Sequence, residues 1–195
     1  DKHVIEQICE AYGIKNPDLK CDIFLTNNEL SVVDDMLLNI IQDDYIVIEP
    51  QSKTNYTPNR AYPFEKWQKV VNDLANHIKV IQVGQKTEKD LKNCIDLTGC
   101  TSFREAAGII KNAEAFIGSE GGLMHVANAV STRSVIVVTG YQHPKMTCYP
   151  ENKNIWISDN HAPCGLKTKC EKCDSLVKNH DYREIVNSTI EIIGR

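Results

Sequence analysis

The chain has 195 residues, a mass of 22.0 kDa and 42% hydrophobic residues, enough for one α/β domain or two very small ones. That composition excludes a disordered or fibrous chain. With 26 acidic and 22 basic side chains the net charge is -4, which offers no basic field for nucleic acid. No apolar run reaches the ~20 residues of a membrane span, and the start lacks a signal-peptide pattern. We therefore expect a soluble, cytoplasmic protein.

Residues 1–44 predict two short helices joined by a polar loop. Apolar residues recur at helical spacing near the start and again over residues 32–40. Asn28 and Ser31 are candidate capping residues for the second helix. No strand is predicted within 1–44 for these helices to pack against. We therefore predict that 1–44 is a helical linker or interdomain segment.

From residue 45 to 195, short β-branched runs alternate with amphipathic stretches. The predicted strands are Tyr45–Ile48, Lys79–Val83, Cys94–Leu97, Ala113–Ile117, Ser134–Val138 and Asn154–Ser158. The predicted helices cover about 64–77, 87–93, 102–110, 123–130 and 182–193, with a loop that carries the late cysteines before the last one. This alternation predicts right-handed crossovers and a Rossmann-like, doubly wound parallel α/β sheet. Such sheets bind ligands at the carboxyl ends of their strands.

The segment 118–125 follows one of these strand ends and opens a helix. Gly121 and Gly122 let the backbone approach a ligand, and a helix N-terminus directs N–H groups and partial positive charge at it, which suits a phosphate or diphosphate. The alternative is a tight turn with a capping serine. Glu120 argues against that alternative, because a carboxylate has little packing reason to lie there. His125 points either at the ligand or into the sheet.

Two other strand ends carry polar side chains. Ser52, Lys53 and Arg60 follow the first strand, where two cations near a helix N-terminus favour clamping of a diphosphate. The alternative is an ordinary solvated loop. Glu88 follows the second strand, where a carboxylate in a first helical turn accepts from a ribose hydroxyl or simply complements the helix dipole.

The late cysteines raise the question of a metal. His161 with Cys164, Cys170 and Cys173 would complete a tetrahedral zinc site. The irregular spacing and the missing second C-x-x-C pair favour a reduced or partly paired thiol cluster in a surface loop instead. The eight cysteines overall are too sparse for a disulfide scaffold and fit a reducing compartment. No serine-hydrolase elbow, zinc-protease motif, Walker loop or strand-linked G-x-G-x-x-G is present.

Several motifs in order resemble the carboxy-terminal half of glycosyltransferase family 9, the heptosyltransferase family of lipopolysaccharide synthesis. They are Arg60–Trp67, Gly84–Glu88, Leu97–Glu105, Gly118–Ala129 and the late cysteines. The resemblance implies one domain of a GT-B fold, in which two Rossmann-like domains enclose the active site and sugar transfer is inverting without a required metal or other cofactor. It implies a nucleotide-sugar donor, commonly ADP-linked, bound by this half.

The resemblance also implies partners. The acceptor, a glycan or lipid-linked glycan, and the catalytic base would belong to an amino-terminal domain missing from this chain. The chain alone would then be inactive, and the whole enzyme would contact the inner face of the cytoplasmic membrane. Two alternatives remain: a non-catalytic nucleotide-sugar-binding module, and a metal-stabilised interaction domain built on the late cysteines. A GT-B epimerase suits the motif order less well.

The family's functional residues map onto named positions of this chain. By this resemblance Ser52 and Arg60 would hold the diphosphate, Glu88 the ribose, and the loop from Glu120 to His125 the phosphate and sugar. The full donor-binding set is Ser52, Lys53, Arg60, Glu88, Ser119, Glu120, Gly121, Gly122, Leu123, Met124 and His125. The family usually has Asp at the position of Glu120 and Lys at that of Arg60. Arginine keeps the charge, whereas the longer glutamate extends its carboxylate by about one methylene and would change the sugar selected.

Overall fold

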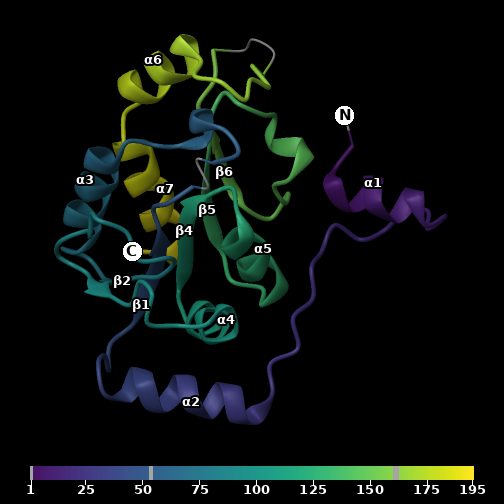
Figure 1. The fold of residues 1–195 in the computed structure, drawn as a ribbon. Coiled ribbons are helices and arrows are strands. Elements are labelled where there is room, and N and C mark those ends of the chain that lie inside the picture. Colours follow the sequence, from purple (N-terminus) through teal and green to yellow (C-terminus); the bar gives the residue numbers. More distant parts are fainter. Residues whose placement is uncertain (1, 53–54, 160–162) are drawn as a thin grey trace.

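The computed structural model describes residues 2–52, 55–159 and 163–195. Its sheet has six parallel strands in the order β3-β2-β1-β4-β5-β6 (Figure 1). Their bounds are β1 Tyr45–Glu49, β2 Lys79–Gln82, β3 Ile95–Asp96, β4 Ala115–Ser119, β5 Ser134–Val138 and β6 Lys153–Trp156. This is the doubly wound order, so the predicted Rossmann-like α/β fold is confirmed.

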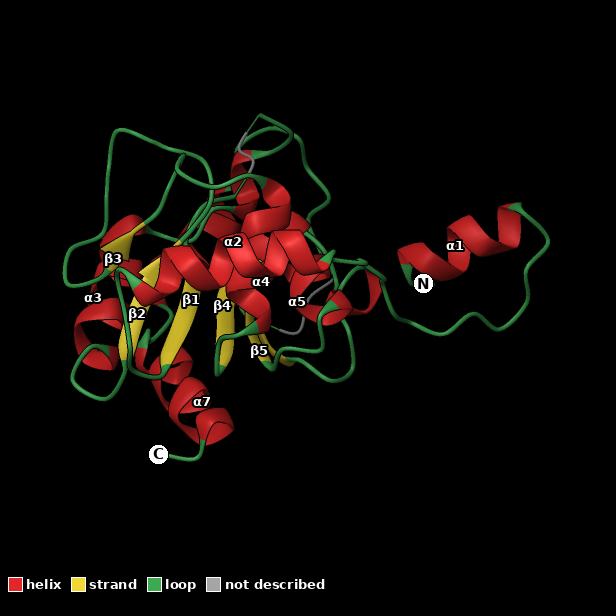
Figure 2. Ribbon diagram, turned by 90° about the horizontal axis from the view of Figure 1, so that it is seen from below, coloured by secondary structure: helices red, strands yellow, loops and turns green. Residues whose placement is uncertain are grey.

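Helices cover both faces of the sheet (Figure 2). One face carries α2 (Asn27–Leu38), α4 (Phe103–Lys111) and α5 (Gly122–Ala129), and the other carries α3 (Phe64–Leu74), α6 (Glu171–Asn179) and α7 (Arg183–Ile193). Successive strand side chains point to opposite faces, so Val47 packs in the first core while Ile46 and Ile48 pack in the second. Burial on both faces is the reason that the central strands β1, β4 and β5 are mostly apolar.

The helix α2 packs against α4 and extends the first core. It begins with a capping box in which Thr26 accepts from the Glu29 N–H and Glu29 accepts from the Thr26 N–H, so the predicted caps Asn28 and Ser31 are wrong. Thr26 has the extended backbone that precedes the first turn, whereas the other two positions are already helical. The buried Val33 of α2 faces Gly108 of α4, where a Cβ would lie only 2.8 Å from Val33 Cγ2. A glycine therefore sets how closely the two helices approach.

The helix α1 (Val4–Ala11) stands apart from the sheet and is joined to α2 by an extended segment (Figure 1). None of its residues is buried. The large apolar side chains left exposed before β1 are Ile8, Tyr12, Ile14, Phe24, Val32, Leu38 and Ile40. The two helices predicted within 1–44 are confirmed, and the role of the segment between domains stays a prediction.

The helix predicted from about Thr87 is wrong, because residues 85–94 form bends and irregular loop. Leu91 is the one large apolar side chain before Cys94 in this segment, so the segment has no apolar stripe that a helix would bury. The buried Leu91 is held instead by its N–H, which donates to Gln82 Oε1 at 3.1 Å. Asn93 has a φ of 61°, which no helix accommodates in its interior.

The helix α6 was not expected, since the late cysteines predicted a loop up to about residue 181. Cys173 and Val177 are its buried residues and lie one helical turn apart, so a cysteine supplies half of the apolar stripe. Among the described residues, we find no helix with the length and hydropathy that a bilayer span requires.

Candidate functional site

The carboxyl ends of β1 and β4 meet at the point where the strand order reverses. The chain leaves β1 for β2 on one side and later returns to β4 on the other, with Glu49 of β1 paired to Gly118 of β4. Doubly wound sheets bind ligands in the crevice outside such a switch point. Of the predicted site loops, those after β1 and β4 therefore lie at the expected place.

The N-terminus of α5 lies at this edge of the sheet and has no side-chain cap. Gly121 is its N-cap residue and makes no side-chain hydrogen bond, so the first N–H groups of the helix are available to an anion. The alternative of a turn capped by Ser119 is wrong, since Ser119 Oγ is buried and has no hydrogen-bond partner among the described residues. Leu123 and Met124 have side chains buried in the core, so only their backbone faces the crevice.

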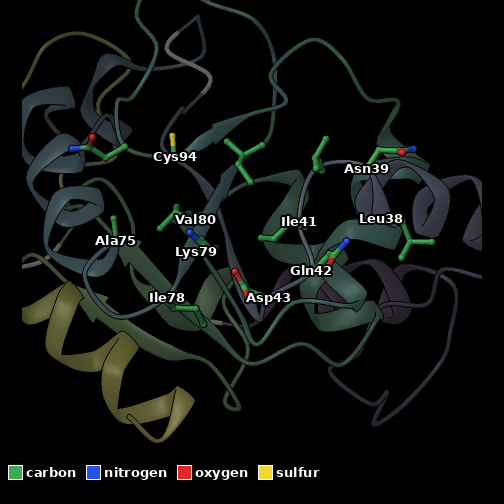
Figure 3. A pocket seen from close by; sticks show the side chains of 13 residues that line it. Leu38, Asn39, Ile41, Gln42, Asp43, Ala75, Ile78, Lys79, Val80 and Cys94 are labelled. Carbon is green, nitrogen blue, oxygen red and sulfur yellow. The ribbon is translucent and has the colours of Figure 1, made fainter.

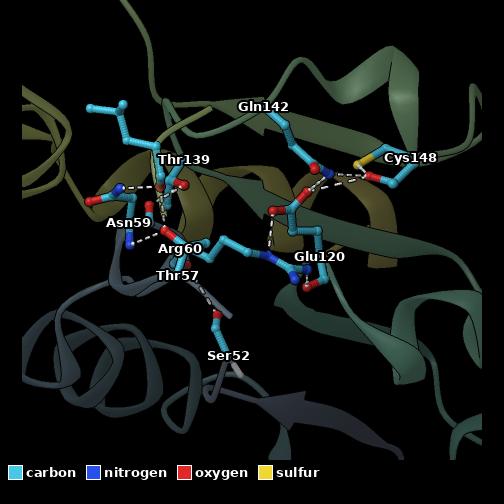
Figure 4. A network of polar contacts seen from close by, with 10 residues as sticks. Ser52, Thr57, Asn59, Arg60, Glu120, Thr139, Gln142 and Cys148 are labelled. Atoms are coloured by element: carbon cyan, nitrogen blue, oxygen red, sulfur yellow. Dashed lines mark hydrogen bonds and ion pairs between the residues drawn. The ribbon is translucent and has the colours of Figure 1, made fainter. Parts of the chain in front are cut away.

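Arg60 and Glu120 form a buried ion pair directly before this helix (Figure 4). Arg60 Nε lies 2.7 Å from Glu120 Oε1, and Arg60 Nη2 donates to the Glu120 carbonyl oxygen at 2.6 Å. The Arg60 side chain is 20% exposed and that of Glu120 is 2% exposed. Burial raises the pKa of Glu120 above its ordinary value, and the Arg60 charge opposes that shift.

The Glu120 carboxylate has two further partners that sequence reasoning missed. Gln142 Nε2 donates to Glu120 Oε2, and Thr147 Oγ1 donates to the same oxygen at 3.3 Å. Both residues follow β5, another strand end at which ligand contacts were expected, but no local motif marks them. The carboxylate therefore lies inside the protein, held on all sides, rather than extended toward a sugar.

The predicted donor-binding residues after β1 and β2 have different outcomes. Ser52 lies beside Arg60, because its Oγ donates to the Arg60 carbonyl oxygen at 3.1 Å. Lys53 lies outside the described residues. Glu88 is exposed in the loop after β2 rather than in a first helical turn, so the structure does not supply the helix that its predicted role assumed.

His125 points into the protein. Its Nδ1 lies 2.6 Å from the hydroxyl of the buried Tyr149, which is also 2.9 Å from Cys21 Sγ. Burial lowers the pKa of His125 below its ordinary 6.5, and the positive fields of His3 and Arg60 add to that effect. His125 is therefore neutral at pH 7 and ties the start of α5 to the segment that precedes α2.

The late cysteines come together, as a metal site requires. The sulfur atoms of Cys164, Cys170 and Cys173 all lie within 4.8 Å of one another. His161, the fourth ligand considered from the sequence, lies outside the described residues. The cluster is not confined to a surface loop, because Cys173 is buried within α6.

A hollow among the described residues lies away from this edge of the sheet. It measures about 630 Å³ and lies at the amino ends of the strands, between the end of α2 and the starts of β2 and β3 (Figure 3). Lining residues include Leu38, Ile41, Lys79 and Cys94. Ligands of doubly wound sheets bind at the opposite, carboxyl edge, so we do not assign the nucleotide-type site to this hollow.

Comparisons with known proteins agree with the fold. The family model for glycosyltransferase family 9 (heptosyltransferase) matches residues 3–176. Lipooligosaccharide heptosyltransferase 2 of Haemophilus influenzae is 34% identical over 67 residues, which are 34% of this chain and 19% of that protein.

Two solved structures share the fold. The E. coli ADP-heptose lipopolysaccharide heptosyltransferase II matches with a TM-score of 0.71 and 16% identity, over 94% of this chain and 56% of that one. A family 9 glycosyltransferase of Veillonella parvula DSM 2008 matches with a TM-score of 0.72 and 13% identity, over 98% and 60%. The chain thus spans well under two thirds of the length of each relative. Since the family model covers most of its residues, the chain belongs to glycosyltransferase family 9 (heptosyltransferase).

Proposed function

We propose that residues 45–195 are the donor-binding half of a GT-B glycosyltransferase. The enzyme would transfer a sugar, with inversion, from a nucleoside-diphosphate sugar to a glycan acceptor in the synthesis of lipopolysaccharide or another surface polysaccharide. One observation carries the proposal: α5 presents an uncapped N-terminus at the switch point, with Arg60 bonded to the residue directly before it.

The proposed chemistry follows from where charge develops. As the bond between the sugar and the diphosphate of the donor breaks, negative charge grows on the departing nucleoside diphosphate. The N–H groups at the start of α5 and the partial positive charge of that helix end would stabilise it. Arg60, with a fifth of its side chain exposed, would add its positive charge at the same place. An ADP-linked donor is our first choice, because the E. coli relative is an ADP-heptose enzyme.

Glu120 takes a positioning role in this proposal. Its carboxylate bonds to Arg60, Gln142 and Thr147 and therefore joins the loops after β1, β4 and β5. An aspartate, one methylene shorter, would reach these partners less easily. The glutamate thus supports the arrangement of three strand ends around the donor, and sugar selection falls to groups that reach the crevice.

The acceptor and the catalytic base would come from a second Rossmann-like domain. The exposed apolar side chains concentrated before β1, Phe24 and Tyr12 among them, fit a segment that packs against such a domain. We therefore propose that the 195-residue chain binds donor but does not transfer sugar by itself. A lipid-linked acceptor would place the complete enzyme at the inner face of the cytoplasmic membrane.

The test uses charge at Gly122, the exposed first residue of α5. A Cβ added there would have Phe103 Cε2, at 3.8 Å, as its nearest neighbour, so Gly122→Ala and Gly122→Asp both fit. The aspartate favours the helix N-terminus but repels a diphosphate. Calorimetry with ADP-, UDP-, GDP- and CMP-sugars should show binding of one nucleotide class to the wild type and to Gly122→Ala.

For Gly122→Asp we expect at least about a tenfold weaker affinity, equivalent to about 1.4 kcal/mol, with an unchanged Tm. Undiminished binding by Gly122→Asp would place the donor elsewhere and refute the proposal. Sugar transfer by this chain joined to its second domain would separate a transferase from a non-catalytic binding module.

A further inference from the structure

Three thiols from one short stretch of the chain meet at the N-terminus of α6. Cys170 is its N-cap residue, Cys173 lies in its first turn, and Cys164 approaches from the preceding loop. Their sulfur atoms lie within 4.8 Å of one another, and Cys164 Sγ is 3.3 Å from Cys173 Sγ. A tetrahedral ion with metal–sulfur bonds of about 2.3 Å holds its sulfurs about 3.8 Å apart. The Cys164–Cys173 separation of 3.3 Å is shorter than that value, and no pair exceeds 4.8 Å.

We propose that Cys164, Cys170 and Cys173 bind one thiophilic divalent ion, zinc in the first place. Thiolate sulfur is the ligand that zinc and iron(II) prefer in tetrahedral sites, and calcium or magnesium would require oxygen instead. Three thiolates leave one coordination position of the ion for a further donor. The proposal does not depend on the assignment of the donor site.

The surroundings leave space for the sulfurs and suit their charge. A Cβ at Gly140 would lie 3.3 Å from Cys173 Sγ, so any other residue there would press on the cluster. The partial positive charge at the N-terminus of α6 complements a cluster of net negative charge. Lys169 and Lys172 lie beside the cysteines in sequence, but their ammonium groups pair with Asp174 and Asp159.

The loop that carries Cys164 and Cys170 is fixed by side chains from a distant segment (Figure 4). Asn59 Nδ2 donates to the carbonyl oxygens of Leu166 and Thr168 at 2.8 and 2.7 Å, and Asn59 Oδ1 accepts from the Cys170 N–H at 2.8 Å. Thr57 Oγ1 also donates to the Leu166 carbonyl. The thiols are therefore held in position by hydrogen bonds, as in a preorganised metal site.

The first experiment measures metal in the whole chain. Protein purified in reductant without chelator is analysed by mass spectrometry for zinc and iron. We expect about one ion per chain in the wild type and less than about a fifth of that in Cys170→Ser. The matched control is Cys100→Ser, which removes an exposed cysteine outside the cluster and should keep its metal.

A second measurement does not rely on a folded variant. Cobalt added to metal-free wild type should produce the sulfur-to-cobalt charge-transfer band, and zinc should abolish it. A chelator should lower the Tm of the wild type and of Cys100→Ser but not that of Cys170→Ser. If the metal analysis finds iron instead of zinc, the three-cysteine site is supported and its ion is iron.

Three results would overturn the proposal. They are wild-type protein that is free of metal and gives no cobalt band, a metal content that survives Cys170→Ser, and a Cys164–Cys173 disulfide in protein kept reduced.

Discussion

Replacing Arg60 by methionine tests the buried ion pair at the centre of the site. Glu120 has a side chain that is only 2% exposed, so Arg60→Met leaves a carboxylate buried without its cation. Removing one partner of a buried pair typically costs 3–5 kcal/mol. We expect the low end, about 3 kcal/mol, because Gln142 and Thr147 still donate to the carboxylate and water reaches the Arg60 position.

The loss should depend on pH with a defined sign. Burial raises the pKa of Glu120 above the ordinary 4.5, and removing Arg60 removes the charge that opposes this rise. A folded-state pKa above the unfolded one means that stability falls as pH rises from 4.5 through the folded pKa. The difference between wild type and Arg60→Met should therefore be smallest near pH 4.5 and largest near pH 8.

Thermal unfolding measures both effects. For a chain of this size about 3 kcal/mol corresponds to a Tm lower by about 6–12 °C at pH 8. The double variant Arg60→Met with Glu120→Gln replaces the lone charge by an amide and should recover most of the loss. A decrease that is equal at pH 4.5 and pH 8, or a double variant less stable than Arg60→Met, would refute the electrostatic argument.

Three further predictions concern the core and the start of α5. Gly108→Ala should cost about 1–3 kcal/mol in urea unfolding, despite its better helix propensity, because its Cβ meets Val33; the cost should shrink in a Val33→Ala background. Because burial lowers the pKa of His125, folding stability should fall as pH decreases below 6.5, and His125→Gln should flatten that slope; an equally steep slope would exclude His125 as its source. Tyr149→Phe should cost about 1–2 kcal/mol, because the hydroxyl contacts both His125 and Cys21, whereas unchanged urea unfolding would show that these contacts add nothing.

The sheet could be predicted from the sequence because its signal is local. The central strands are short apolar runs buried on both faces, and Ser134–Val138 was expected and found with the same bounds. The errors fall where the local signal was misleading. The stretch after Thr87 has helix-forming residues but no apolar stripe, and α6 buries a cysteine that drew attention to chemistry rather than packing.

The location of the site also follows from the sequence. A parallel sheet directs its ligand to the carboxyl ends of its strands, and Gly121 with Gly122 marks one of those ends. The side chains that contact Glu120 could not be predicted from the sequence. Arg60 is 60 residues from Glu120, and Gln142 is 22 residues from it in the other direction.

The sequence alone therefore determined the fold class, the edge of the sheet where we propose the donor site and the glycines at the start of α5. The tertiary structure alone decided that Arg60 pairs with a buried Glu120 and that His125 turns inward to Tyr149. The physical reason is the sequence distance over which each signal acts. Hydrophobic periodicity and backbone freedom act over a few residues, whereas these contacts form only when folding brings distant segments within hydrogen-bond distance.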